Sequence, residues 1–237
     1  MELKAVSLRV SMFAKKRLLL NLNLFLLVCL MSCHKQPIAS EAIKNSLKNI
    51  AGKPVFIRIF KQEDLLEVWL EGKEKFELFK TYEICNWSGS LGPKLKEGDG
   101  QSPEGFYIVN KELLKPDSRY HRAFNIGFPN EFDRQNGRTG SFIMVHGDCV
   151  SIGCYAMTDP FIEEIYYLVD QALKNGQLEF SVHIFPFKMT NENLNKNKDH
   201  KWYQFWCNLK EGYDLFEKGH IPPLWKAVHK KYVFELP

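Results

Sequence analysis

Three short apolar segments follow one another along the chain, at residues 55–60, 65–70 and 76–84. They are rich in Val, Ile, Leu and aromatic residues and partly alternate with polar residues. Charged connectors at 61–64 and 71–75 join them, and these connectors are too short for crossover helices. The pattern therefore predicts three consecutive antiparallel strands.

A fourth strand and two helices are predicted further along the chain. Residues 178–187 alternate apolar and polar side chains, which is typical of a half-buried strand. Thr158-Asp159-Pro160 is a helix-start signal in which the aspartate can cap, and the apolar residues after it fall on one helical face up to Asn175-Gly176. A second helical spacing of aromatic residues runs from Trp202 to about Gly219. We therefore expect a mainly β, α+β protein with a packed helix and a helical C-terminal extension.

The N-terminal segment has the organisation of a secretory signal. Basic residues 15–17 precede an apolar stretch at 18–30, which is too short for a comfortable membrane span. Leu30-Met31-Ser32-Cys33 resembles a bacterial lipobox, which implies a lipid on Cys33 as the mature N-terminus, and His34 favours the outer membrane of a Gram-negative bacterium. The alternative is an uncleaved anchor, and translation starts at Met1 or Met12.

The signal segment carries all of the net charge. The whole chain has 32 basic and 28 acidic residues, of which five basic residues and one acid precede residue 34, so 27 of each sign remain. A neutral mature chain lacks the basic excess of nucleic-acid-binding proteins. Residues 34–52 are mostly polar and are expected to form a tether with at most a short helix at 41–50.

One stretch combines a thiol with a base. The apolar run 142–145, which we expect to be a buried strand, leads directly to His146, and Cys154 follows after a segment that contains Gly147 and Gly153. Glycine allows turns and close approaches that other residues do not. Because a cysteine attacks as its thiolate, a neighbouring imidazole is the usual group to take its proton.

The stretch resembles the catalytic signature of the L,D-transpeptidase family, cysteine enzymes that act on peptidoglycan stem peptides. The matching residues are His146, Gly147, Ser151, Gly153 and Cys154. The resemblance implies an antiparallel β-sandwich catalytic domain at 53–187, followed by the helical extension at 188–237. It also implies Cys154 as nucleophile, His146 as general base and acid, a carbonyl near Gly147 that orients the imidazole, and an oxyanion site of backbone N–H groups near Gly153 and Cys154.

Other positions refine this resemblance. Ser102-Pro103-Glu104-Gly105 resembles the family's Thr-Pro-x-Gly turn beside the active site. Ile152 and Ala156 stand where many members have histidine and arginine, and the connection after His146 is short. These features are similar to a divergent branch that includes hydrolases releasing peptidoglycan-linked lipoprotein.

The expected function is acyl transfer through a cysteine thioester on diaminopimelate-containing stem peptides, in the periplasm and without a cofactor. Two alternatives stay open: a hydrolase that releases peptidoglycan-linked lipoprotein, and an inactive, lipid-anchored wall-binding protein. Arg138 and Tyr155 are further candidates for the substrate cleft, beside Ser151 and Gly153.

The cysteines have competing interpretations. Cys85, Cys149, Cys154 and Cys207 remain after the signal and the lipobox cysteine. In an oxidising compartment Cys149 and Cys154 could form a disulfide, although we favour Cys154 as a free thiol with a pKa lowered by His146. Zinc binding by His146, Cys149, Cys154 and His183 is the other alternative, but the spacing matches no strong zinc signature, and no metal is expected.

Overall fold

The computed structural model describes residues 36–237, so the predicted signal and Cys33 lie outside the described residues. The chain divides into two units, 1–46 and 47–237. The first contains most of helix α2 (Gln36–Leu47), which begins and ends earlier than the short helix predicted at 41–50. No helix within residues 36–237 is long and apolar enough to cross a membrane. The account below concerns residues 47–237.

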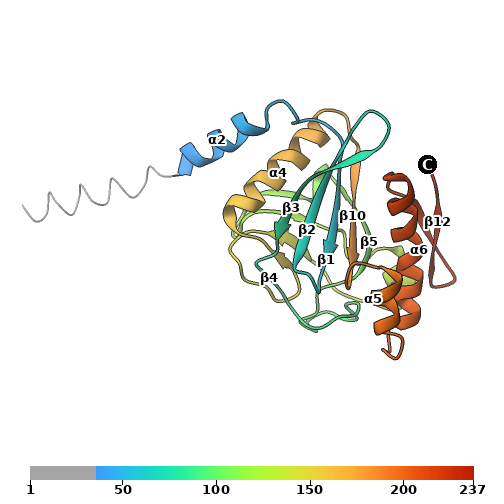
Figure 1. Ribbon diagram of the computed structural model, residues 1–237. Helices are drawn as coiled ribbons and strands as arrows, with labels where there is room; N and C mark the ends of the chain where they lie inside the picture. The colour runs from blue at the N-terminus through green and yellow to red at the C-terminus, as the bar shows by residue number, and fades with distance from the viewer. Residues whose placement is uncertain (1–35) are drawn as a thin grey trace, which may run out of the picture. The chain divides into compact units, whose positions relative to one another are not determined.

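The first sheet contains the three consecutive strands predicted from the sequence. They are β1 (Val55–Phe60), β2 (Leu65–Glu71) and β3 (Phe76–Glu83), each antiparallel to the next. The sheet continues as β1, β10 (Glu179–Phe185) and β5 (Gly105–Asn110), as Figure 1 shows. Every residue of the central strand β1 is buried, which explains its nearly continuous apolar sequence.

The second sheet carries the candidate site. Its strand order is β4 (Asn86–Trp87), β9 (Tyr155–Ala156), β8 (Met144–His146), β7 (His121–Asn125) and β6 (Leu114–Ser118). A 3-10 helix η1 (Lys111–Leu113) precedes β6, and a short helix α3 (Glu131–Gln135) lies between β7 and β8. The two sheets pack through Phe124 of β7 and Phe180 of β10, whose ring centroids are 5.5 Å apart. The result is the mainly β, α+β architecture expected from the sequence.

Two strand pairs are parallel, β1 with β10 and β8 with β9, in contrast to the purely antiparallel expectation. The second pair is unusual because only residues 147–154 connect its strands. Parallel neighbours normally need a longer crossover. Here the strands are very short, and Asp148, Cys149 and Gly153 take positive φ angles of 69°, 48° and 113° that fold the connection back on itself.

Helix α4 (Asp159–Lys174) confirms the predicted helix after the motif and packs against β7 and β1. Its apolar face is buried, as the helical spacing required; the buried residues are Ile162, Ile165, Tyr166, Leu168, Val169 and Ala172. Thr158, rather than Asp159, occupies the N-cap position. The Asp159 carboxylate is instead used by the neighbouring loop, as described below.

The C-terminal extension contains helices α5 (Asn191–Lys196) and α6 (Tyr203–Gly219) and a hairpin of β11 (Leu224–Val228) and β12 (Lys231–Glu235). The aromatic spacing correctly predicts α6, but the hairpin is not predicted. Figure 1 shows α6 beside this hairpin. Trp206 and Tyr232 are buried in one cluster with Phe106 of β5, so the extension shares a core with the first sheet.

Candidate active site

A cavity of about 710 Å³ opens beside the ends of β8 and β9. Both His146 and Cys154 line it. One wall comes from the β6–β7 hairpin and the other from the segments on either side of β8; the remaining lining residues are Lys115, Asp117, Ser118, Arg119, Tyr120, Phe142, Met144, Val150, Ser151 and Ile152. The structure therefore brings the predicted thiol and base into one cleft.

His146 is the last residue of β8 and is only 3% exposed. Its Nδ1 lies 2.6 Å from the carbonyl oxygen of Gly147. A carbonyl can only accept a hydrogen bond, so Nδ1 carries the proton and Nε2 of the neutral ring keeps a free lone pair. Burial lowers the pKa of His146, while the Gly147 bond and the charge of Asp148 act in the opposite direction. The neutral imidazole is thus favoured and is suited to accept a proton.

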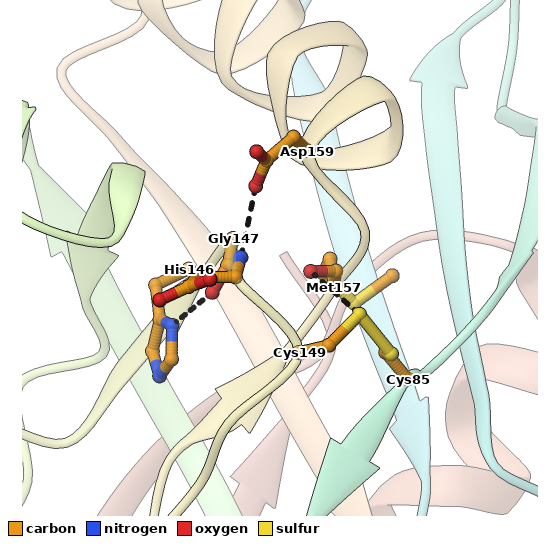
Figure 2. The surroundings of a disulfide bond; sticks show 7 residues. Cys85, His146, Gly147, Cys149, Met157 and Asp159 are labelled. Carbon is orange, nitrogen blue, oxygen red and sulfur yellow. Dashed lines mark hydrogen bonds between the residues drawn. A yellow bond between two sulfur atoms is a disulfide. The ribbon is translucent and has the colours of Figure 1, made fainter.

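Gly147 has a steric reason to be glycine. A Cβ built there would lie 2.5 Å from Asp159 Oδ1 and 3.0 Å from the Cβ of His121. The same Asp159 oxygen accepts a hydrogen bond of 2.9 Å from the Asp148 amide, and Figure 2 shows this carboxylate above the loop. The first turn of α4 therefore holds the loop that orients the imidazole.

Cys154 lies immediately before β9, and its side chain is partly buried. Sγ contacts the Met144 amide at 3.4 Å and the Phe142 carbonyl at 3.7 Å, rather than the imidazole. Burial raises the pKa of the Cys154 thiol, and the Met144 amide and the positive charge of Lys94 offset this only in part. The lowered thiol pKa expected from the sequence is therefore wrong for this geometry.

The peptide carbonyl of Cys154 accepts two hydroxyl hydrogen bonds. Ser151 Oγ donates to it at 2.8 Å and Ser102 Oγ at 3.1 Å. The predicted substrate-binding residue Ser151 lines the cavity, but its hydroxyl is directed to this carbonyl. Together the two serines fix the peptide plane that follows Cys154.

A buried ion pair between Lys61 and Glu104 lies beside Ser102 and holds its carbonyl group. Lys61 Nζ donates to the carbonyl of Ser102 at 3.0 Å and lies 3.1 Å from Glu104 Oε1, and both side chains are fully buried. Glu104 also accepts from the Gly92 amide at 2.6 Å and from Trp206 Nε1 of α6 at 2.8 Å. Sequence reasoning noted the Ser102–Gly105 turn but did not identify Ser102, Lys61 or Glu104 as site residues. Lys61 is the first residue of the charged connector 61–64, so the local sequence does not distinguish it from a solvent-exposed lysine.

Cys149 forms a disulfide with Cys85, drawn in Figure 2, and Cys154 is free. The favoured free thiol is thus confirmed, and the alternative Cys149–Cys154 bridge is wrong. In the zinc alternative, Cys149 cannot serve as a ligand because its sulfur is in the disulfide. This alternative also loses His183, which is fully buried with its ring 4.6 Å from that of Phe56 and outside the cavity lining.

Several sequence candidates do not line the cavity. Arg138 is buried, pairs with Asp133 at 2.8 Å and lies over the ring of Phe132, so its expected place in the cleft is wrong. Tyr155 is also fully buried, and its hydroxyl donates to the Pro103 carbonyl at 2.7 Å. Gly153 supplies the positive φ before the nucleophile, and its place in an oxyanion site stays a prediction.

The apolar run before His146 is also only partly buried. Phe142, which we expected inside a strand, precedes β8 with a positive φ of 54° and is 70% exposed at the cavity. The strand itself begins only at Met144, so Phe142 belongs to the turn that precedes it. One wall of the cavity therefore presents an exposed aromatic side chain.

Comparisons with known proteins identify the family of this chain. The family model described as the L,D-transpeptidase catalytic domain (YkuD) matches residues 54–184. Two proteins named "Putative L,D-transpeptidase YafK", from Escherichia coli K12 and O157:H7, are each 48% identical over 194 residues, covering 82% of this chain and 79% of theirs.

Solved structures give weaker matches. The helical cell shape determining protein Pgp2 of Campylobacter jejuni matches with a TM-score of 0.45 and 18% identity, over 80% of each chain. L,D-transpeptidase 1 of Mycobacterium tuberculosis matches with a TM-score of 0.33 and 14% identity, over 56% of this chain and 62% of that one. On the family model and the curated relatives, the chain belongs to the L,D-transpeptidase catalytic domain family.

Proposed function

We propose that this protein is a cysteine acyltransferase that acts on diaminopimelate-containing stem peptides of peptidoglycan through a thioester on Cys154. One observation carries the proposal: Cys154 and His146 line a single cavity, and the Nδ1 of His146 is held by the Gly147 carbonyl. A nucleophile, a base and a group that orients the base are the parts that covalent acyl transfer requires.

The reaction begins with a neutral thiol and a neutral imidazole. His146 Nε2 takes the proton of Cys154 as the sulfur attacks the carbonyl carbon of diaminopimelate in the stem peptide. Because burial disfavours the charge of both groups, this proton transfer accompanies attack rather than preceding it. The side-chain rotation that brings Sγ toward Nε2 is part of this step.

Collapse of the tetrahedral intermediate completes acylation. The bond between the carbonyl carbon and the leaving nitrogen breaks, the nitrogen takes the proton from His146, and a thioester remains on Cys154. Backbone N–H groups near Gly153 and Cys154 are proposed to hold the oxyanion, a contribution typically worth several kcal/mol. The acceptor then attacks the thioester carbon while His146 takes its proton, the bond between that carbon and the sulfur breaks, and the sulfur receives the proton from His146 to restore the thiol.

The acceptor decides between the two enzymatic outcomes. An amine makes a crosslink, whereas water makes the protein a hydrolase that releases a peptide or a linked lipoprotein. The exposed apolar wall of Phe142, Val150 and Ile152 favours the hydrolase as the second candidate. A polypeptide linked to the stem would cover this wall as the leaving group, whereas a single leaving amino acid would not.

Intact-mass analysis after treatment with a carbapenem tests whether the thiol is acylated. We expect one adduct on the wild-type protein and on Cys207→Ala, which removes the other free thiol, and none on Cys154→Ala. An inactive wall-binding protein would give no adduct on any of them. Mass spectrometry of sacculi digested with the protein then identifies crosslinked, trimmed or lipoprotein-free stems, and unchanged sacculi would contradict the proposal.

We further propose that the protein acts in the periplasm, anchored through lipid on Cys33 to the outer membrane. The support is the sequence alone, because Cys33 lies outside the described residues. Substituting Cys33→Ser is expected to move the protein from the membrane fraction to the soluble periplasm or to leave a precursor. Unchanged mass and fractionation would refute lipidation.

A further inference from the structure

The tip of the β6–β7 hairpin is held against the catalytic histidine. Ser118 pairs with His121, so Arg119 and Tyr120 form the tight turn between the strands. The Gly147 amide donates to the Tyr120 carbonyl at 3.0 Å, which ties this turn to the residue after His146. The position of the tip relative to the base is therefore fixed by backbone hydrogen bonding.

The side chains at the tip form a stack on the imidazole. The ring of Tyr120 lies 4.9 Å from the ring of His146, with 34° between their planes. The guanidinium carbon of Arg119 lies 5.0 Å from the centroid of the Tyr120 ring. An arginine that is already stacked on an aromatic face loses less freedom when it binds a ligand. The order Arg119, Tyr120, His146 thus places a cation at a set distance from the base.

The charged groups of the cavity are concentrated on this hairpin. Lys115, Asp117 and Arg119 line the hairpin wall, while the opposite wall exposes Val150 and Ile152, at 51% and 87%. Among residues 36–237, the ion pairs include neither Lys115 nor Arg119. Two cations and one carboxylate therefore line the cavity without ion-pair partners among these residues, and Lys115 Nζ donates to the Glu112 carbonyl at 3.3 Å.

We propose that the β6–β7 hairpin tip is a subsite for the free amino-acid end of the substrate, in which Arg119 binds its carboxylate. This inference rests on the proposed function, because diaminopimelate in a stem peptide keeps one carboxylate and one amine outside the main chain. Arg119 offers a planar pair of donors that matches a carboxylate, and Lys115 adds a second positive charge. Asp117 on the same wall complements the ammonium group. The stack of Arg119, Tyr120 and His146 then sets the distance between the bound carboxylate and the carbonyl that Cys154 attacks.

A binding cycle tests the inference without requiring turnover. Calorimetry with full-length Cys154→Ala protein would compare a diaminopimelate stem tetrapeptide with the analogue whose free diaminopimelate carboxylate is an amide. The same pair of ligands is measured after adding Arg119→Gln, Arg119→Lys or Lys111→Gln. Lys111 is an exposed lysine in η1 outside the cavity lining, so it controls for the loss of one positive charge.

We expect the parent protein to bind the carboxylate peptide on the order of tenfold more tightly than the amide. The ratio should fall to near one in Arg119→Gln, recover in part in Arg119→Lys and stay unchanged in Lys111→Gln. An unchanged ratio in Arg119→Gln, or no binding of either peptide, would overturn the inference. Failure of the proposed function shows differently: the binding cycle would be intact, but wild-type protein would form neither adduct nor product.

Discussion

The Cys85–Cys149 disulfide should stabilise the fold without taking part in the chemistry. We consider the double substitution Cys85→Ala and Cys149→Ala, which removes the bridge and leaves no unpaired partner. The bridge closes a loop with a sequence separation of 64 residues. In the chain-entropy model, a loop of this length stabilises the folded state by about 4 kcal/mol. For a domain of this size, that corresponds to a fall in melting temperature of roughly 10 °C.

The bridge also holds the loop between His146 and Cys154. Asp148 and Cys149 both have positive φ angles, which cost about 1 kcal/mol or more for residues with a Cβ, and the disulfide helps to keep them there. Without it, the loop populates other conformations, and the fraction with His146 and Cys154 in place falls. We therefore expect reduced but measurable activity in the double variant, in contrast to complete loss in Cys154→Ala.

Urea denaturation and a turnover assay on sacculi measure these two effects. Cys207→Ala is the matched control, because this cysteine is free in α6, and its loss should change the free energy of unfolding by no more than about 1 kcal/mol. Wild-type protein that has been reduced should behave like the double variant. The reasoning is refuted if the double variant is as stable as the wild type, or if it is as inactive as Cys154→Ala.

Three other substitutions test single interactions. His146→Ala should abolish turnover and slow alkylation of Cys154 by iodoacetamide near neutral pH; an equal rate and pH midpoint would mean that another group activates the thiol, or none. Burial lowers the pKa of His183 well below its usual range, so below about pH 6.5 the unfolded chain takes up a proton that the folded chain does not. The free energy of unfolding should consequently decrease as the pH is lowered through this region, and His183→Leu should make that decrease smaller in urea titrations; an unchanged slope contradicts it. Trp206→Phe removes a hydrogen bond to the buried Glu104 carboxylate and should lower the free energy of unfolding by about 1–3 kcal/mol, whereas a neutral effect would show that water replaces the indole.

The elements that the sequence predicts well are those whose side chains carry a local period. Strands β1 and β2, helix α4 and helix α6 each bury one face or a continuous run, so their spacing determines their type. The β11–β12 hairpin is short and mostly exposed, and it is held by contacts of Tyr232 with residues distant in sequence, which no local pattern contains.

The residues of the candidate site also differ in how well the sequence predicts their arrangement. His146, Gly147 and Cys154 lie within one stretch of chain, and their arrangement follows from that stretch. Ser102 reaches Cys154 only through the turn after a long loop, and Cys85 pairs with Cys149 across the second sheet. Such contacts depend on how the strands are ordered, which residue spacing does not specify.

The protonation state of the catalytic pair could not be predicted for a physical reason. A sequence shows that a thiol and an imidazole are near each other, but the pKa of each depends on how much water the fold removes around it. Here burial dominates for both groups, raising the thiol pKa and lowering the imidazole pKa, so the neutral pair is favoured over an ion pair. A neutral resting pair is also consistent with Sγ contacting the Met144 amide and not the imidazole. In the proposed reaction, the energy needed to create the thiolate would then come from the attack itself, when the negative charge passes from sulfur to the oxyanion and its proposed N–H donors.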